Sequence, residues 1–251
     1  MNKVLHYAMN IGEQMLLCGA DVHRVEECIS RICYAFDADR IDVFIITSSM
    51  VATIYCKDGS TYTQTRRITN VDTDIEKLHL LNDLSRKICS EHLSFKEIDK
   101  EMELIQKRKK YNLFTEFVAY AIIACSFTLF FGGTVIESIV SFFVGIFCRF
   151  VALIAEKSNM SRLFSKFFCS FMSTVLVFTA IKIGIIKVAD SVVIGNIMVL
   201  VPGIGITNAL KDLLSGDSIA GVLRTVEAIL YGLAIATGYF VVVFLFGGTF
   251  V

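Results

Sequence analysis

Four polar residues toward the carboxyl end have the types and spacing needed to bind a small molecule. Arg224 and Glu227 are three residues apart, so a helix would place them on one face. A guanidinium holds a carboxylate through two parallel hydrogen bonds, and a carboxylate binds an amino group or carries a proton. Asn208 and Asp212, four residues apart, would add polar contacts if their segment re-enters the membrane. The set predicts a binding site for a small polar substrate.

The element that must position these residues contains the only proline of the 251 residues, Pro202. It lies with Gly203 in an apolar run at 191–210, which is just long enough to cross a bilayer. Proline lacks a backbone N–H donor and glycine is conformationally free, so the pair predicts a kink or break in the helix. A broken span frees backbone groups to face a polar substrate. We therefore expect a transport path here.

An alternative remains open for the two charged residues. Residues 228–246 are apolar and long enough to span the membrane alone. Arg224 and Glu227 would then lie at the headgroup level as ordinary interfacial anchors. Residue types alone do not separate the two interpretations, but Pro202 favours the functional one.

The distribution of charge predicts two domains. The 24 basic and 24 acidic residues balance, yet they crowd the first 110 positions, and apolar runs fill the rest. We expect a soluble cytoplasmic α+β domain at 1–110 and an all-α membrane domain of about five transmembrane helices at 111–251. The charge balance does not indicate a nucleic-acid partner. Residues 1–17 contain Asn10 and Glu13 and no small-residue cleavage site, so no signal peptide is predicted.

The first domain alternates between two periodicities. Apolar residues three and four apart predict helices at 4–17 and 22–36, with a stop at Gly19 and an N-cap at Asp21. Residues rich in β-branched and aromatic types predict antiparallel strands at 41–46, 50–56 and 61–69, with a hairpin turn at 57–60. Capping boxes at 73–76 and 94–97 predict helices running to about residues 91 and 110.

No recognised catalytic signature occurs in this domain. A hydrolytic site built from Thr47 or Ser48 with His23 remains an alternative, because such sites assemble in space and not in sequence. The eight cysteines form no C-x-x-C pair and do not cluster with histidines at metal-ligand spacing. We expect free thiols, no metal and no cofactor.

Apolar runs predict spans at about 113–131, 135–155, 164–186, 191–210 and 221–246. Glu137 and Arg149 lie too far apart along the second span to pair, so each needs another helix or the interface. The basic run at 107–110 and Lys166 fall on one predicted side of the membrane, whereas Lys182 and Lys187 fall on the other. The positive-inside rule therefore places the first domain in the cytoplasm and the carboxyl end outside.

Several segments together resemble the larger, amino-terminal portion of the threonine/serine exporter family. They follow the family's order over nearly the whole chain, and the last group is long enough to be specific. The segments are Gly19-Ala20-Asp21-Val22-His23-Arg24-Val25-Glu26, Thr65-Arg66-Arg67-Ile68, Leu81-Asn82-Asp83-Leu84-Ser85-Arg86, Phe131-Gly132-Gly133, Met198, Val201-Pro202-Gly203, Asn208, Asp212, Gly216-Asp217, Gly221, Arg224 and Glu227-Ala228.

The resemblance implies a secondary exporter in the cell (plasma or inner) membrane that moves threonine, serine or dicarboxylates such as succinate. The family's carboxyl-terminal membrane portion is not seen in this chain, so the resemblance implies a large subunit that works with a second, small integral membrane subunit. The implied partners are that subunit, a small-molecule substrate and the lipid bilayer. Besides a hydrolase, a membrane-anchored sensor or scaffold remains an alternative to this non-enzymatic function.

Overall fold

The structure is a computed structural model that describes residues 1–69, 71–108 and 111–246. The chain forms two compact units. The amino-terminal unit comprises Met1–Lys109 together with Ile204–Val226, and the carboxyl-terminal unit comprises Lys110–Gly203 and Glu227–Val251. A segment distant in sequence is therefore part of the first unit. The domain division at residue 110 stays a prediction.

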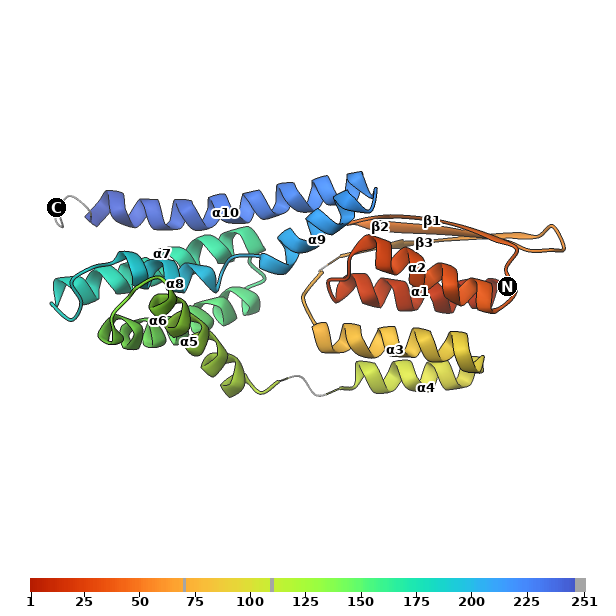
Figure 1. The fold of residues 1–251 in the computed structure, drawn as a ribbon, viewed down its shortest axis with the longest axis horizontal. Coiled ribbons are helices and arrows are strands. Elements are labelled where there is room, and N and C mark those ends of the chain that lie inside the picture. The colour runs from red at the N-terminus through yellow and green to blue at the C-terminus, as the bar shows by residue number, and fades with distance from the viewer. Residues whose placement is uncertain (70, 109–110, 247–251) are drawn as a thin grey trace. The chain divides into compact units, whose positions relative to one another are not determined.

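The amino-terminal unit has the predicted order of two helices, three strands and two helices (Figure 1). Two further elements, α9 and the first turns of α10, complete it. The elements are α1 (Asn2–Leu17), α2 (Val22–Ala35), β1 (Arg40–Ile46), β2 (Ser49–Tyr55), β3 (Thr61–Arg67), α3 (Ile75–Glu91), α4 (Phe95–Gln106), α9 (Gly203–Leu214) and α10 (Ser218–Phe246).

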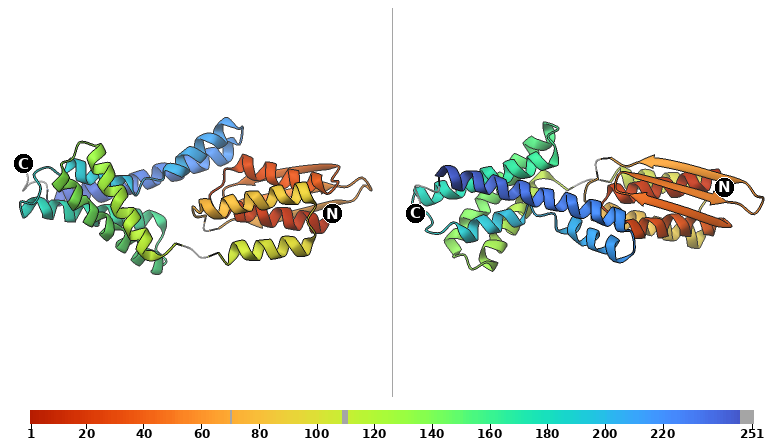
Figure 2. Two further views of the ribbon diagram at one scale, coloured as in Figure 1. Left: turned by 60° about the horizontal axis from the view of Figure 1, so that its bottom comes forward. Right: turned by 90° about the horizontal axis from the view of Figure 1, so that it is seen from above.

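The three strands form an antiparallel sheet in the order β1-β2-β3, as predicted. The strands lie side by side over α1 and α2 (Figure 2). Alternate residues of β2, including Met50 and Ile54, are fully buried and join Leu5 of α1 and Ile29 of α2 in the core. The period of two in the strand thus supplies one apolar face to the helices.

Local signals explain where most helices begin and end. Gly19 has a φ of +88°, which ends α1, and the Asp21 carboxylate accepts the Arg24 backbone N–H at 3.0 Å and caps α2. The capping box at Ser94 is present. The box predicted at residues 73–76 is wrong, because Asp74 caps α3 through the Lys77 backbone N–H instead.

Part of the basic run before the first apolar helix has a structural partner. Arg108 donates to both carboxylate oxygens of Asp74, at 2.5 Å, and contacts Glu76. Its side chain is only 14% exposed. Arg108 therefore ties the segment after α4 to the start of α3, in addition to any role in topology. The remainder of the run, residues 109–110, lies outside the described residues.

The carboxyl-terminal unit is entirely helical where it is described. Among the described residues, four helices, including α10, are long and apolar enough to cross a membrane, and the number is five if the bent pair of α8 and α9 counts as one span. Outward-facing aromatic residues such as Phe130 and Phe143 are largely exposed, as expected of surfaces that face lipid. The helices not yet introduced are α5 (Leu113–Phe130), α6 (Val135–Lys157), α7 (Arg162–Lys182) and α8 (Asp190–Met198).

Candidate functional site

Three of the six predicted site residues meet in the amino-terminal unit at the loop between α1 and α2. Asn208 of α9 donates its side-chain N–H to the Gly19 carbonyl at 2.7 Å. Arg224 of α10 donates to the Ala20 carbonyl at 2.8 Å. These carbonyls follow the end of α1, where no helical N–H is available to them. The helical hairpin of α9 and early α10 thus caps the loop.

Asp212 provides the centre of this contact. Its Oδ1 accepts the Val22 backbone N–H at 2.9 Å, and its Oδ2 lies 3.2 Å from Nε of Arg224. The Nε–H of Arg224 does not make a hydrogen bond with Oδ2, so the contact between Arg224 and Asp212 is an ion pair. The Asp212 side chain is 0% exposed and that of Arg224 is 12% exposed. We call Asn208, Asp212 and Arg224 the hairpin dock.

Close helix packing holds the hairpin together. Ala220 of α10 is buried in the core of the amino-terminal unit. A Cβ on Gly221 would lie 2.6 Å from Cγ of Leu213 and 2.9 Å from its backbone N. Only glycine allows α9 and α10 to approach this closely at that point.

Two acidic residues adjoin the hairpin dock. Oδ2 of Asp217, in the turn between α9 and α10, is buried and has no hydrogen-bond partner in the described part of the chain. Burial, together with the charges of Asp217 and Asp212, raises the pKa of Glu26 on α2 to about 7. His23 and a hydrogen bond with the Ile45 backbone oppose that rise. Glu26 thus carries a proton near neutral pH.

The other three predicted residues lie elsewhere. Pro202 precedes the first residue of α9, Gly203, at the interruption of the apolar run. Glu227 is exposed and accepts a hydrogen bond from the Tyr231 hydroxyl at 2.6 Å. Arg224 and Glu227 were predicted to share one face of a helix. In the described residues they have no protein partner in common. Their roles in binding substrate stay predictions.

The interruption at Pro202 brings in a residue that the sequence analysis used only for topology. α8 ends at Met198, which leaves the Leu200 carbonyl without a regular helical donor. Lys166 of α7 donates to that carbonyl at 2.7 Å and is only partly exposed. The signal that could have identified it is a lysine inside a predicted span, near its start, although its place beside the broken helix depends on tertiary packing.

A second polar group lies within the apolar helices of the carboxyl-terminal unit. Thr128 of α5 donates to Ser141 of α6 at 2.7 Å, and Asn196 of α8 donates to the same hydroxyl at 2.9 Å. All three side chains are nearly or fully buried. The Asn196 carbonyl oxygen has no hydrogen-bond partner in the described residues. We call Thr128, Ser141 and Asn196 the polar cluster.

Sequence reasoning missed the polar cluster because its members are neutral. Serine and threonine are common in membrane helices, and only Asn196 interrupts its apolar run conspicuously.

The two charged residues of the second predicted span do not pair with each other, as their spacing indicated. Arg149 pairs with Glu116 of α5, with Nε 3.0 Å from Oε2, and with Glu156. Glu137 contributes instead to the capping box of α6.

The residues of the alternative hydrolytic site are not joined by a hydrogen bond in the part of the chain that the structure describes. His23 is exposed on α2, whereas Thr47 and Ser48 form the turn between β1 and β2. None of these residues lines a described pocket of the amino-terminal unit.

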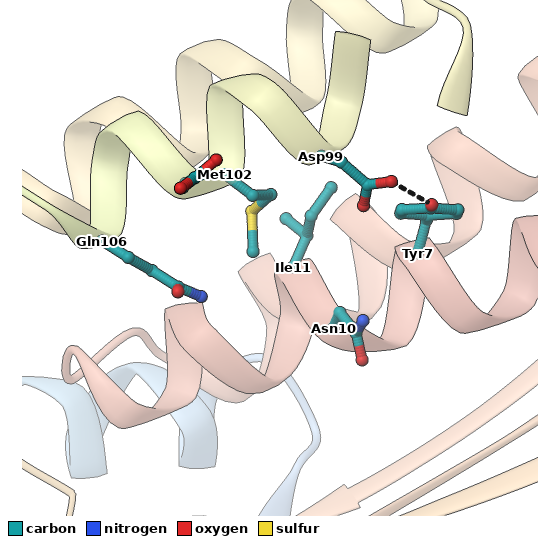
Figure 3. Close-up of a pocket in the computed structure, with 7 residues that line it drawn as sticks. Tyr7, Asn10, Ile11, Asp99, Met102 and Gln106 are labelled. Atoms are coloured by element: carbon teal, nitrogen blue, oxygen red, sulfur yellow. Dashed lines mark hydrogen bonds between the residues drawn. The ribbon is translucent and has the colours of Figure 1, made fainter. Parts of the chain in front are cut away.

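The amino-terminal unit includes two pockets that bear on the candidate site. One, of about 210 Å³, lies between α1 and α4, where the Tyr7 hydroxyl donates to Asp99 at 2.8 Å (Figure 3). That bond raises the pKa of Tyr7. The other, of about 260 Å³, lies beside the hairpin dock and includes Asn208 in its lining. Among the predicted site residues that the structure describes, only Asn208 lines either pocket.

Comparison with known proteins gives relatives of two kinds. Pheromone-regulated membrane protein 10 of Pichia sorbitophila is 26% identical over 252 residues, which are 96% of this chain and 25% of that protein. The probable succinate transporter subunit YjjP is 24% identical in Klebsiella aerogenes, over 89% of this chain and 86% of that protein. The YjjP of Escherichia coli K12 is 23% identical, over 94% and 91%.

The chain spans about a fifth to a third of the length of the pheromone-regulated relatives that it matches. No solved structure matches it. The family model described as putative threonine/serine exporter matches residues 6–246, which include the hairpin dock, the broken helix and the polar cluster. The chain therefore belongs to the putative threonine/serine exporter family.

Proposed function

We propose that this protein is a subunit of a membrane exporter that moves small polar metabolites out of the cell. The family description supports threonine and serine as substrates. The names of two bacterial relatives, which are probable succinate transporter subunits, support a dicarboxylate. Both substrate classes carry a carboxylate, so the path must lower the cost of moving a negative charge through apolar surroundings.

The observation that carries the proposal is the interruption between α8 and α9. Discontinuous helices in transporters present unpaired backbone groups to substrates and ions. Here the Leu200 carbonyl meets the Lys166 ammonium at 2.7 Å. A cation held at a broken helix is suited to attract a substrate carboxylate and to exchange its backbone partner for it. Pro202 and Gly203 maintain the interruption.

The polar cluster supplies a second set of groups, of which Asn196 lies on α8, the helix that ends at this interruption. The free Asn196 oxygen accepts a hydrogen bond from a substrate ammonium or hydroxyl. Arg224, in contrast, already has Asp212 and the Ala20 carbonyl as partners. We therefore assign Arg224, Asp212 and Asn208 first to positioning the hairpin. Direct contact of Arg224 or Glu227 with substrate stays a prediction.

The protein works with a second, small integral membrane subunit in this proposal, because the bacterial relatives are named as subunits. It lies in the cell membrane with the amino-terminal unit in the cytoplasm and the carboxyl end outside. The basic run at 107–110 and Lys166 fall on one side of the membrane in this proposal and only Lys182 and Lys187 on the other, and this asymmetry supports that orientation.

Export of labelled threonine, serine and succinate from cells tests the proposal. The chain is expressed with and without a candidate small membrane subunit, and wild type is compared with Lys166→Met. The matched control is Lys182→Met, at the exposed opposite end of α7. Membrane levels of each variant are measured by quantitative immunoblotting. We expect export that needs both chains and is lost in Lys166→Met only.

The outcomes separate the alternatives. Normal export by Lys166→Met would remove the broken helix from the path. Export of none of the three solutes by any combination would favour a membrane-anchored sensor or a hydrolase. A change in the preference between succinate and threonine in Arg224→Lys, at unchanged membrane level, would support direct substrate contact by Arg224.

A further inference from the structure

The 260 Å³ pocket beside the hairpin dock combines segments that are far apart in sequence. It lies where the α1–α2 loop, the starts of α2 and α3, and α9 meet within the amino-terminal unit. Pockets for drug-sized ligands usually measure about 300–1,000 Å³, so this one suits a smaller metabolite. Its lining residues are Cys18, Gly19, Ala20, Asp21, Arg24, Thr73, Ile75, Leu78, Ile204, Thr207, Asn208 and Lys211.

Two cations line this pocket. Arg24 on α2 is exposed, and its guanidinium has no hydrogen bond or ion pair in the described part of the chain. Lys211 on α9 is 57% exposed, and its ammonium lies 3.9 Å from Oδ2 of Asp21. That distance exceeds a hydrogen bond, so the ammonium keeps donors for another acceptor.

The only carboxylate among the lining residues already has a structural task. Oδ1 of Asp21 accepts the Arg24 backbone N–H at 3.0 Å and caps α2. The lining thus carries the two positive charges of Arg24 and Lys211 and the single negative charge of Asp21, which is partly offset by the backbone N–H that Asp21 accepts. The first turn of α9, which supplies Ile204, adds the positive end of a helix dipole.

Part of the remaining lining of the pocket is an apolar wall. Ile75 and Leu78 of α3 and Ile204 of α9 provide it. A short carbon chain contacts such a wall favourably, while its charged end stays with the cations. The pocket between α1 and α4 offers the opposite charge, because its only ionised lining groups are Asp99 and Glu103.

We propose that the pocket beside the hairpin dock binds a small carboxylate metabolite, with the carboxylate between Arg24 and Lys211 and the carbon chain on Ile75 and Leu78. The choice of metabolite rests on the proposed export function. The site itself is separate from the broken helix, because every lining residue belongs to the amino-terminal unit. Asn208 belongs to both the dock and the pocket, so a bound carboxylate lies against the hairpin that the dock positions.

Isothermal titration calorimetry tests the inference. The purified full chain in detergent is titrated with succinate and, separately, with threonine. We expect saturable binding of at least one of them. Arg24→Gln and Lys211→Gln should each weaken that binding about tenfold, since each removes a charge-assisted hydrogen bond. Arg31→Gln is the control, because Arg31 lies two turns further along α2, pairs with Glu27 and does not line the pocket.

Both substituted cations are exposed, so their variants should fold, and an unchanged melting temperature checks this. Lys211→Arg should retain binding, because it keeps the charge. Absence of saturable binding to wild type, or equal binding by wild type and both glutamine variants, would overturn the inference. Neither result touches the export function, which is measured in cells and depends on Lys166.

Discussion

In the hairpin dock, charged side chains meet one another and backbone groups, whereas in the polar cluster neutral hydroxyl and amide groups meet among apolar helices. Asp212 and Arg224 form an ion pair; Asp212 also accepts the backbone N–H of Val22 at the start of α2, and Arg224 donates to the Ala20 carbonyl in the α1–α2 loop. In the polar cluster, Asn196 keeps an acceptor without a protein partner. The dock uses its polarity to hold a fold together. The cluster retains polarity that a passing molecule can use.

The first prediction concerns the ion pair and has the largest expected effect. Asp212→Ala leaves Arg224 buried without its counter-charge, which typically costs about 3–5 kcal/mol. We expect the apparent melting temperature of the purified chain to fall sharply and protease cleavage near the hairpin to increase. Asp39→Ala, at an exposed position of the same unit, should change neither property.

A double-mutant cycle sharpens this prediction. Replacing Asp212 and Arg224 together by leucine should destabilise the chain less than Asp212→Ala alone, because no unpaired charge remains. Additive effects of the two single substitutions would show that the pair is not coupled. The hairpin would then be held by apolar packing only.

The second prediction tests the packing of the hairpin without changing charge. Gly221→Ala places a methyl group 2.6 Å from Leu213, and overpacking of this kind typically costs about 1–3 kcal/mol. The control is Gly232→Ala on the same helix, where a Cβ would meet nothing within 4 Å. Thermal melts of both variants should show a loss for Gly221→Ala only. Equal melting temperatures would mean that α9 and α10 adjust freely.

The difference between the two regions also explains what the sequence could predict. Local signals such as Asp21, Gly19 and the alternation around Met50 gave the order of the elements in the amino-terminal unit, because they depend on neighbouring residues. Asn208 and Asp212 were expected to contact a substrate, and that stays a prediction; in the structure they bond the Gly19 carbonyl and the Val22 backbone N–H. These partners lie 189 and 190 positions away in the sequence, so no local pattern could predict the contacts.

The polar cluster was beyond prediction for a different reason. Thr128 and Ser141 have ordinary residue types for membrane helices, and the pairing depends on how α5, α6 and α8 cross. Close approach of α8 to α5 at Gly195, where a Cβ would lie 2.2 Å from the Thr128 hydroxyl, brings them together. Helix crossings of this kind follow from tertiary packing, which periodicity does not specify.

The third prediction uses the raised pKa of Glu26. The folded chain holds this proton up to about pH 7, whereas an ordinary glutamate has a pKa of 4.5. Between these values the folded state binds more protons than the unfolded state, so the free energy of unfolding falls as the pH rises. We expect a fall of about 1–2 kcal/mol, after allowance for the partial exposure of Glu26.

Melting temperatures of wild type and Glu26→Gln, measured across this pH range, check the effect. Glutamine cannot ionise, so the variant should lose the pH dependence and be the more stable protein at the upper end. Glu27→Gln is the control, because Glu27 is exposed and pairs with Arg31. Parallel profiles for wild type and Glu26→Gln would assign the pH dependence to other groups.

The fourth prediction concerns the polar cluster and has the smallest expected effect on stability. Asn196→Leu removes two hydrogen bonds but also removes the unpartnered oxygen, and interhelical hydrogen bonds in membranes average only about 0.6 kcal/mol. The melting temperature should therefore change little, while export of labelled substrate falls strongly. Thr179→Val is the control, because its hydroxyl bonds only the backbone of its own helix in the described structure. Unimpaired export by Asn196→Leu would make the cluster a packing feature and erase its distinction from the hairpin dock.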